Sequence, residues 1–460
     1  MKIIIKYYKE MLLFLLTLVL GVLIIQPGHN WGGDFALYIE QAIALSEGSL
    51  NELYEQNKFA MEHSQYTLGP FLYPIGFPVI LSPFVTIFGL NFMLLKFVVF
   101  LFFLGSFILF SHFSRQFITN SWLVLIASVL YFLHPSSLSL VDNVLSDFPY
   151  LFFTLLALFY YFKPRNTKNS VCLGLALFFS YAIRDFGLVL FLALSITDFL
   201  KYNPLKRLKS LSWVVPYLIF ILGYIASKGL LLKGGENHWA LLFDSFSFSM
   251  ILDNFVYYLE LLQEFLYLPS SYLLIPVFLT IIIGISTSFK KSLPVVTYIV
   301  CVGFILILWP AKQGIRLLLP ILPFLLLFIV VGLQTIIKRS KPVLGKPLKI
   351  SFIGIFCLVL YFFTLDISNV VKRNSNGVDT ALSHELYSFV QDEIPEELII
   401  AFEKPRVLRL FTKRNAVFSS PEHFKESIAE VMILHRYQYS KDLATYDTLF
   451  SSESFVIIKK

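Results

Sequence analysis

The chain has 460 residues, of which 57% are hydrophobic and only 15% are charged, and its mean hydropathy is +0.73. This composition excludes an ordinary soluble protein and indicates an integral membrane protein, whose main partner is the lipid bilayer. The net charge of +7 would favour a nucleic-acid ligand only if the basic residues formed a solvated patch. They occur instead in short clusters between apolar runs, so we expect no nucleic-acid partner.

The three cysteines lie inside apolar runs, which favours small lipid- or core-facing side chains over a disulfide framework or a metal site. They are Cys172, Cys301 and Cys357. No Walker A loop, HExxH, CxxC or GxSxG motif occurs, which disfavours an ATP-driven pump. We expect no cofactor. No ligand cluster indicates a metal, although a divalent metal remains compatible with the sequence.

Apolar runs of roughly membrane-spanning length predict an α-helical polytopic protein with about eleven transmembrane helices. The runs lie near residues 10–25, 91–113, 120–134, 145–162, 170–183, 186–200, 211–230, 272–288, 293–309, 315–336 and 349–366. Lysines precede the first run, and no small-residue cleavage site follows it. We therefore expect an uncleaved anchor and a cytoplasmic N-terminus.

The basic clusters predict the orientation of the later spans. If the spans alternate, one set of loops holds Arg115 and the clusters at 163–168, 201–209, 290–291 and 338–349, and these loops should be cytoplasmic. Counting Phe77 to Leu90 as a further span would invert every later loop. We expect this segment to be interfacial or re-entrant, a form tolerated where it packs on protein.

Three regions should then lie outside the membrane, in a cell membrane that we expect to be bacterial. The first outer loop, residues 26–75, predicts helices at Phe35–Ser46 and Leu50–Met61. The second, Leu231–Ser271, contains an aromatic segment, Phe248–Leu268, that predicts an interfacial helix.

The third outer region, residues 370–460, predicts a small α/β domain beside a transmembrane domain of residues 1–369. Its expected elements are helices at Ser383–Gln391 and Phe424–Val431 and strands at Glu397–Phe402 and Phe455–Ile458.

Eight ionisable side chains fall at outer span ends or in outer loops on this topology. They are Asp34, His63, Asp142, Asp147, Arg184, Asp185, Lys312 and Arg316. Because such groups are costly near a membrane, they are functional candidates by default.

The two acids at helix starts each have two interpretations. Asp34 follows Gly32-Gly33 and is either the N-cap of the next helix or a reactive group, and position 37 is Leu, so no capping box supports the cap. Asp147, two residues before Pro149, also resembles a helix start. Two acids from separate loops can nevertheless share a pocket, one as a base and the other holding substrate hydroxyls or orienting the first.

The basic candidates are also open to two interpretations. Lys312 and Arg316 either mark the interface by snorkelling or bind a phosphate, and their place on the side depleted of positive charge favours phosphate. Arg184 either pairs with the adjacent Asp185 or contacts substrate. His63 either helps to bind phosphate or acceptor or is a surface residue.

Five short stretches in this order resemble the GT-C superfamily of membrane glycosyltransferases, especially the branch of protein O-mannosyltransferases and aminoarabinose transferases. They are GGDFALYIEQAIALSEG, YPIGFPVILSPF, SDFPYLFF, GIRLLLPILPF and IPEELIIAFEKPR. Ile75 replaces the second proline of the family's Tyr-Pro-Pro-Gly-like element, and Leu317 replaces the tyrosine of its late R-Y-L-x-P element.

The resemblance implies an inverting transfer of a sugar from a dolichyl- or undecaprenyl-phosphate donor to a glycan, lipid or protein acceptor. Asp34 would be the general base, and Asp147 the second catalytic acid. Arg316, with Lys312, would bind the donor phosphate. Tyr73, in the Tyr-Pro element, is a further candidate for substrate binding, with His63, Asp142 and Arg184.

Two other classes of protein fit the composition less well. An O-antigen polymerase or ligase would place its chemistry in one large, late outer loop, whereas the acids here come early. A lipid-linked glycan flippase or transporter would show inverted repeats with broken helices in matching halves, and no such symmetry is evident.

Overall fold

The computed structural model describes residues 2–66, 69–201, 210–231, 247–340, 342–371 and 377–460. Each of the eleven apolar runs contains a helix, since a helix satisfies every backbone polar group within its own segment. These helices are α1 (Lys2–Ile24), α5 (Phe92–Ser114), α6 (Ser121–Phe132), α8 (Asp147–Tyr161), α9 (Thr167–Ile183), α10 (Gly187–Lys201), α12 (Leu211–Leu231), α15 (Leu274–Ser286), α16 (Phe289–Leu308), α17 (Leu322–Arg339) and α18 (Pro342–Val371).

Only some of the described helices are long enough to cross a membrane on their own. Within the described ranges, α5, α16, α17 and residues Gly345–Val371 of α18 are long and apolar enough to cross a membrane. A fifth span is formed if α6 and α7 (Pro135–Val141), which meet at a bend of 59°, are counted as one. The remaining apolar helices are shorter, so the total of eleven spans stays a prediction.

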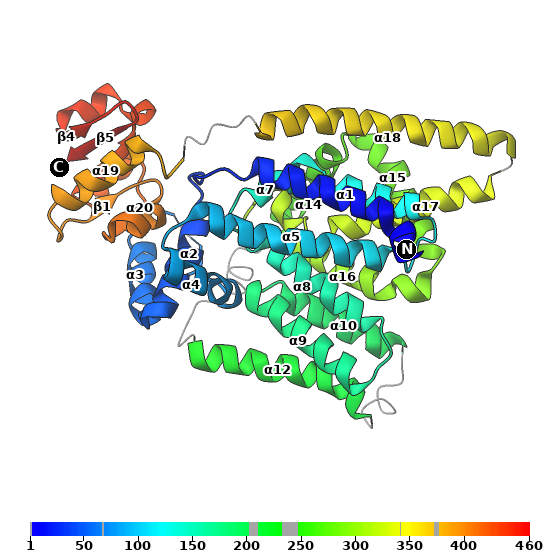
Figure 1. Cartoon of the computed structure of the whole chain (residues 1–460). Helices are drawn as coiled ribbons and strands as arrows, with labels where there is room; N and C mark the ends of the chain where they lie inside the picture. The colour runs from blue at the N-terminus through cyan, green and yellow to red at the C-terminus, as the bar shows by residue number, and fades with distance from the viewer. Residues whose placement is uncertain (1, 67–68, 202–209, 232–246, 341, 372–376) are drawn as a thin grey trace.

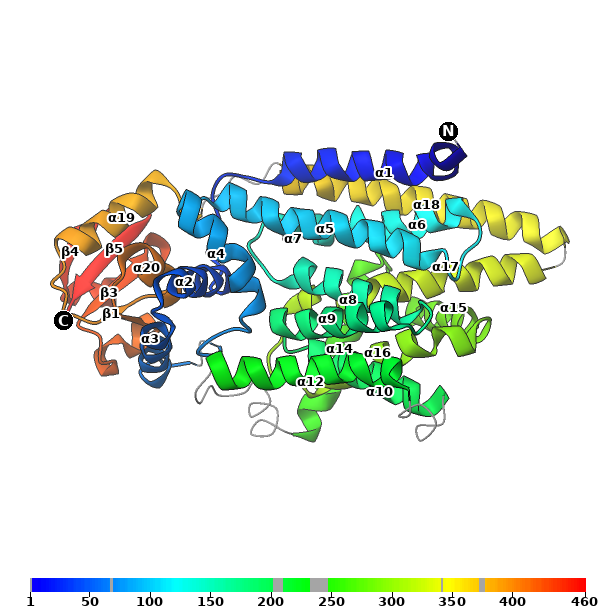
Figure 2. The ribbon, with the colours of Figure 1, turned by 60° about the horizontal axis from the view of Figure 1, so that its bottom comes forward.

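The long helices α1, α5 and α18 run alongside one another, with the N-terminus at one end of the bundle and the C-terminal sheet at the other (Figures 1 and 2). Large apolar side chains on α1 and α18 are exposed, as expected for lipid-facing surfaces; they include Leu12, Leu23, Ile350, Ile355 and Tyr361. The chain is thus built as an integral membrane protein. Which end faces the cytoplasm stays a prediction.

The two helices expected in the first outer loop are present as α2 (Asp34–Glu47) and α3 (Leu50–Glu62). They lie between the helical bundle and the C-terminal sheet (Figure 2). The Phe77–Leu90 segment forms α4 (Gly76–Phe88), which packs on α2, α5 and α9. Its 13 residues extend only about 20 Å, short of a hydrocarbon core of about 30 Å, but α15 has the same length, so the exclusion of α4 from the spans stays a prediction.

The aromatic segment of the second outer loop forms α14 (Phe248–Phe265), which packs on α16. Tyr258, Leu262 and Phe265 are buried there. Two 3₁₀ turns connect the later helices, η1 (Ser271–Leu273) and η2 (Gly314–Leu317). The second turn lies between α16 and α17.

The C-terminal region is an α/β unit with a five-stranded mixed sheet. Its elements are α19 (Ala381–Asp392), β1 (Ile400–Ala401), α20 (Pro405–Thr412), β2 (Ala416–Val417), η3 (Pro421–Glu426), β3 (Val431–His435), η4 (Arg436–Gln438), η5 (Lys441–Thr445), β4 (Asp447–Ser451) and β5 (Phe455–Lys459). The strand order is β2-β1-β3-β5-β4, with β1 parallel to β2 and β3, and β5 antiparallel to β3 and β4.

Alternate residues of β3 are buried on opposite faces of the sheet, as the period of a strand requires. Val431 and Ile433 pack with α19 and α20, whereas Met432 and Leu434 pack with η3 and η5. The sequence-based strands at 397–402 and 455–458 and the helix at 383–391 are confirmed in position.

The helix predicted at Phe424–Val431 is wrong. Residues Pro421–Glu426 form a 3₁₀ turn, and Val431 begins β3, the central strand of the sheet. The run VMILH is too short for periodicity to separate a buried strand from a helix. Its pairing with β1 and β5, which are distant in sequence, decides the outcome.

Two glycines bring α15 and α17 into close contact. A Cβ atom at Gly332 would lie 2.0 Å from the carbonyl oxygen of Thr280, and one at Gly284 would lie 2.2 Å from that of Phe328. We predict that Gly332→Ala lowers the free energy of unfolding by about 1–3 kcal/mol because the two helices must separate.

The measurement is thermal unfolding in detergent. Gly303→Ala on α16 is the matched control, since a Cβ atom there meets no atom within 4 Å. Equal melting temperatures for the two variants would contradict the proposed close packing.

Candidate active site

Arg316 links two carboxylates that come from different parts of the chain. Its Nη1 donates to Asp34 Oδ2 at 2.9 Å, and its Nη2 and Nε donate to Asp147 Oδ2 at 3.1 and 3.3 Å. The Tyr73 hydroxyl donates to the other oxygen of Asp34 at 2.8 Å, and Arg184 Nη1 donates to Asp147 Oδ1 at 2.5 Å. Five of the predicted site residues therefore form one connected cluster.

The two acids occupy equivalent places at helix starts. Asp34 is the first residue of α2 and Asp147 the first residue of α8, where the helix dipole favours negative charge. The interpretation of either acid as an N-cap is wrong, because Gly33 and Ser146 hold the cap positions. Neither carboxylate is used to cap its helix, so both are available to Arg316.

Arg316 is presented by the turn η2. Gly314, two residues earlier, has a φ of +65°, which side chains other than glycine rarely adopt. Its N–H donates to the Tyr257 hydroxyl of α14 at 2.9 Å. This turn places the guanidinium against both acids.

The exposure of the two acids differs greatly. The Asp147 side chain is 2% exposed, whereas that of Asp34 is 34% exposed and that of Arg316 is 22% exposed. Asp147 lies behind Arg316 and is also held by Arg184, so it can act as a fixed anchor. Asp34 is the carboxylate that a ligand from solvent can reach.

Two neighbours of Asp34 on α2 hold Tyr73 in place. Tyr38 stacks on the Tyr73 ring at 4.5 Å between centroids, and its hydroxyl lies 2.8 Å from Ser146 Oγ. Gln41 makes two hydrogen bonds of 2.9 Å to the backbone of Tyr73. The hydroxyl that meets Asp34 is therefore fixed by ring and backbone contacts.

The electrostatics of the cluster keep Asp34 ionised. Burial raises the pKa of this carboxyl, but the charge and hydrogen bond of Arg316, together with the Tyr73 hydroxyl, outweigh burial and hold the pKa below its usual range. Two carboxylates face two guanidiniums, so the cluster is balanced in formal charge. An ionised Asp34 can accept a proton, and its basicity rises if Arg316 turns to another anion.

The other sequence candidates lie apart from this arrangement. Lys312 is exposed and lies 5.1 Å from the ring centre of Tyr257, on the same turn as Arg316. His63 is exposed at the end of α3, with its ring 4.5 Å from that of Phe59. Asp142 bonds Lys96 at 2.6 Å. Arg184 differs from these residues because it belongs to the cluster, where it pairs with Asp147. The sequence had offered the adjacent Asp185 as its partner.

Lys96 is a residue that the sequence reasoning missed. It is 1% exposed on α5, and its Nζ donates to Asp142, to the carbonyl oxygen of Gln26 at 3.0 Å and to that of Gly28. The signal was present, because a lone lysine inside FMLLKFVVFLFF requires a partner. The pair ties down the segment that leads from α1 to Asp34.

Tyr38, Gln41 and Arg406 were also missed. Nothing in their sequence context separates them from ordinary interface residues, and only the fold brings them to Tyr73. Within the described ranges, no group of three or more His, Cys, Asp or Glu side chains is placed to hold a metal ion. The expectation of no metal stays a prediction.

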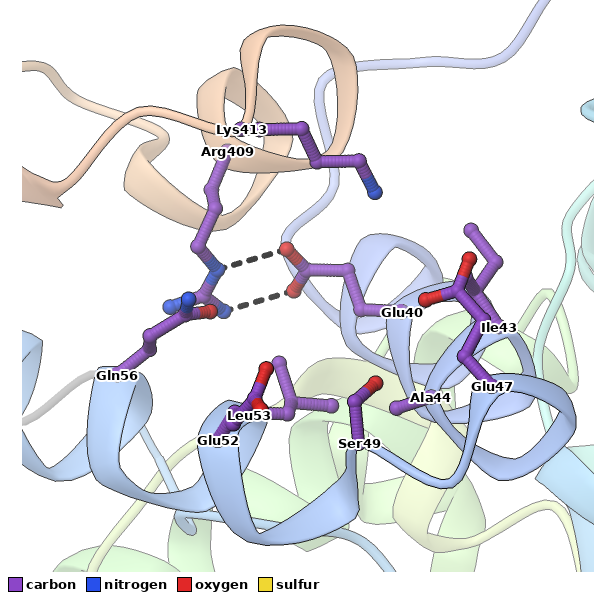
Figure 3. Close-up of a pocket in the computed structure, with 10 residues that line it drawn as sticks. All are labelled: Glu40, Ile43, Ala44, Glu47, Ser49, Glu52, Leu53, Gln56, Arg409 and Lys413. Carbon is purple, nitrogen blue, oxygen red and sulfur yellow. Dashed lines mark hydrogen bonds and ion pairs between the residues drawn. The ribbon is translucent and has the colours of Figure 1, made fainter. Parts of the chain in front are cut away.

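A separate polar cavity of about 200 Å³ lies between α2, α3 and α20 (Figure 3). Its lining combines the carboxylates of Glu40, Glu47 and Glu52 with the basic side chains of Arg409 and Lys413. The Glu40 and Arg409 side chains pair with each other at its edge.

The chain is similar to solved structures of membrane proteins over nearly its whole length. ArnT from Cupriavidus metallidurans bound to undecaprenyl phosphate matches with a TM-score of 0.63 and 12% identity, and the match covers 97% of each chain. ArnT in the apo state matches with a TM-score of 0.61 at the same identity and coverage.

The archaeal oligosaccharyltransferase AglB from Archaeoglobus fulgidus, in complex with an inhibitory peptide and a dolichol-phosphate, matches with a TM-score of 0.58 and 11% identity. This match covers 94% of the present chain and 70% of AglB. No protein-family model matches the sequence, and no curated protein matches it either. At these identities the matches show the fold alone, and the polytopic helical fold with a small C-terminal α/β domain expected from the sequence is confirmed.

We predict that Lys96→Met lowers the free energy of unfolding by about 2–4 kcal/mol because it leaves the Asp142 carboxylate without its cation. The loss should fall short of that for a fully buried pair, since the Asp142 side chain is 26% exposed. Adding Asp142→Asn should recover part of the loss, because no unpaired charge then remains.

Thermal unfolding in detergent measures both effects. The exposed Lys290 supplies the control variant Lys290→Met, which should melt like the wild type. A Lys96→Met protein as stable as this control would contradict the role of the pair.

Proposed function

We propose that the chain is an inverting glycosyltransferase that moves a sugar from a polyprenyl-phosphate donor to an acceptor at the outer face of the membrane. The observation that carries the proposal is the Arg316 guanidinium held between one accessible and one buried carboxylate. The fold adds support, since structures with this fold were solved with undecaprenyl phosphate and with dolichol-phosphate. The acceptor is a hydroxyl-bearing glycan, lipid or protein.

In this proposal Arg316 binds the donor phosphate. A guanidinium has five N–H donors in a fixed fork that matches phosphate oxygens. Nη1 is engaged by the accessible Asp34, whereas Nη2 and Nε are held by the buried Asp147. A phosphate entering from the outer space therefore competes first for the bond to Asp34.

Donor binding and activation of the base are coupled in this arrangement. When Arg316 turns toward the phosphate, Asp34 loses the cation that most lowers its pKa and becomes a stronger base. Asp147 and Arg184 keep the guanidinium in place during this exchange. Asp34 is thus a stronger base when a donor is present than when it is absent.

The transfer step then follows from the positions of these groups. Asp34 takes the proton of the acceptor hydroxyl while the acceptor oxygen attacks the anomeric carbon of the sugar. The bond from that carbon to the phosphate oxygen breaks, and its electron pair leaves with the polyprenyl phosphate. Arg316 stabilises the charge that develops on this leaving group.

We predict that Asp34→Asn lowers the transfer rate by about 100-fold or more, because an amide cannot accept the acceptor proton. The assay is transfer from polyprenyl-phosphate sugar in membranes that contain the variant. Asp253→Asn, at an exposed position of α14, is the control and should behave as the wild type. Normal transfer by Asp34→Asn would exclude this residue as the base.

We also predict that Arg316→Ala weakens binding of undecaprenyl phosphate about 10- to 100-fold, the worth of a charge-assisted hydrogen bond. Arg184→Ala should weaken it less, because the Arg184 guanidinium contacts Asp147 and is not paired with the accessible acid. Arg316→Lys, which keeps the charge but loses the fork, should lie between the wild type and Arg316→Ala. Equal affinities in the two alanine variants would count against the phosphate role.

A further inference from the structure

We infer that the C-terminal domain completes the active site, with Arg406 of α20 as a positioning residue that acts on Asp34 through Tyr73. The inference rests on the proposed function and extends it to a part of the chain remote in sequence. Arg406 lies 372 positions after Asp34 in the chain. The contacts between them form a short chain of three side chains.

The first contact joins Arg406 to the segment that carries Tyr73. Its Nη2 donates to the carbonyl oxygen of Pro70 at 2.8 Å, and its guanidinium carbon lies 5.9 Å from the centre of the Tyr73 ring. Gly69, with a φ of +97°, turns the chain beside this guanidinium. Arg406 thus contacts the Tyr73 segment through both its backbone and its aromatic ring.

The burial of Arg406 is poorly explained by stability alone. The residue is 6% exposed, and its Nε has no hydrogen-bond partner among the described residues. A buried cation whose donors are only partly satisfied costs free energy. A function for the charge itself accounts for this cost.

The second contact joins Tyr73 to the base. The Tyr73 hydroxyl donates to Asp34 Oδ1 at 2.8 Å, and Tyr38 and Gln41 restrict its ring and backbone. Arg406 also lies over this ring, 5.9 Å from its centre. Loss of Arg406 therefore removes one of the contacts that position the Tyr73 ring.

A second arginine of α20 fixes the helix that carries Asp34. Arg409 donates to both oxygens of Glu40 at 2.7 Å (Figure 3). It also donates to Asn57 Oδ1 at 2.7 Å. Glu40 lies six residues after Asp34 on α2, about 9 Å along the helix axis. Helix α20 therefore holds both the helix of the base and the loop of its tyrosine.

The positive charge of Arg406 also reaches Asp34. The charged and titratable groups around this carboxylate are Arg316 on η2, Tyr73 in the first outer loop, Tyr38 on α2, Arg406 on α20 and, beyond Arg316, Asp147 on α8. Burial raises the pKa of Asp34, Arg316 and the Tyr73 hydroxyl lower it, and Arg406 lowers it further by a smaller amount. Its removal should raise that pKa, and the acid limb of the pH–rate profile should move to higher pH.

The test compares Arg406→Gln with Arg406→Lys in the full-length protein. Arg406→Gln should lower kcat about tenfold or more, as expected for a displaced catalytic group, with little change in the KM for the donor. It should also move the acid limb of kcat/KM to higher pH. Arg406→Lys should restore the position of the acid limb, because it keeps the charge, and should recover only part of kcat.

Arg436→Gln is the matched control within the same domain. Its guanidinium donates to Ser451 Oγ at 2.7 Å, within the C-terminal domain. This variant should have the kcat and the pH profile of the wild type. A general loss of domain stability would lower kcat without moving the acid limb, so the pH profile separates a positioning role from a structural one.

A double-mutant cycle with Tyr73→Phe tests the route through tyrosine. If Arg406 acts through Tyr73, Arg406→Gln in the Tyr73→Phe background should lower kcat much less than it does in the wild type. Multiplicative effects, or an Arg406→Gln variant with wild-type kcat and acid limb, would overturn the inference. A wild type that transfers no sugar from any polyprenyl-phosphate donor would instead refute the proposed function, and the inference with it.

Discussion

The site depends on one guanidinium that is shared unequally between two acids. Asp147 is buried and has a second cation in Arg184, so its bond to Arg316 is difficult to displace. Asp34 is partly exposed, and its bond to Arg316 is the one that an incoming anion meets. This difference between the two acids depends on three features. They are the helix starts that carry the acids, the glycine turn before Arg316 and the tyrosine beside Asp34. In the proposed function, Arg316 can therefore keep its bond to Asp147 while it exchanges its bond to Asp34 for one to the donor phosphate.

The sequence predicts the helices well because a segment in lipid must satisfy its backbone polar groups internally, which a helix does. Every apolar run contains a helix, and Asp34, Asp147 and Arg316 meet in one cluster, as the charge pattern and the family resemblance implied together. The separation of Asp34 and Asp147 from a capping role was not predictable, because a helix start looks the same in sequence whether or not its carboxylate is used as the cap.

The parts that the sequence did not predict depend on long-range contacts. β3 forms because β1 and β5 pair with it, and the short run VMILH carries no periodic signal for this. Arg406 and Arg409 look like the polar residues of an ordinary amphipathic helix until α20 is seen against α2. Lys96 is the exception, since a lysine within an apolar run indicates that it has a buried partner. The sequence does not identify that partner.

The buried Arg409–Glu40 pair restricts how the C-terminal domain can be exchanged. Any other seating of α20 on α2 would leave both charges buried without a partner, at a cost of several kcal/mol. The pair therefore specifies a single orientation of the domain more than it strengthens the interface. A homologous domain grafted onto this membrane core would need the matching α2 and α3 as well. The first outer loop and the C-terminal domain therefore form one structural unit, although the membrane helices separate them in the chain.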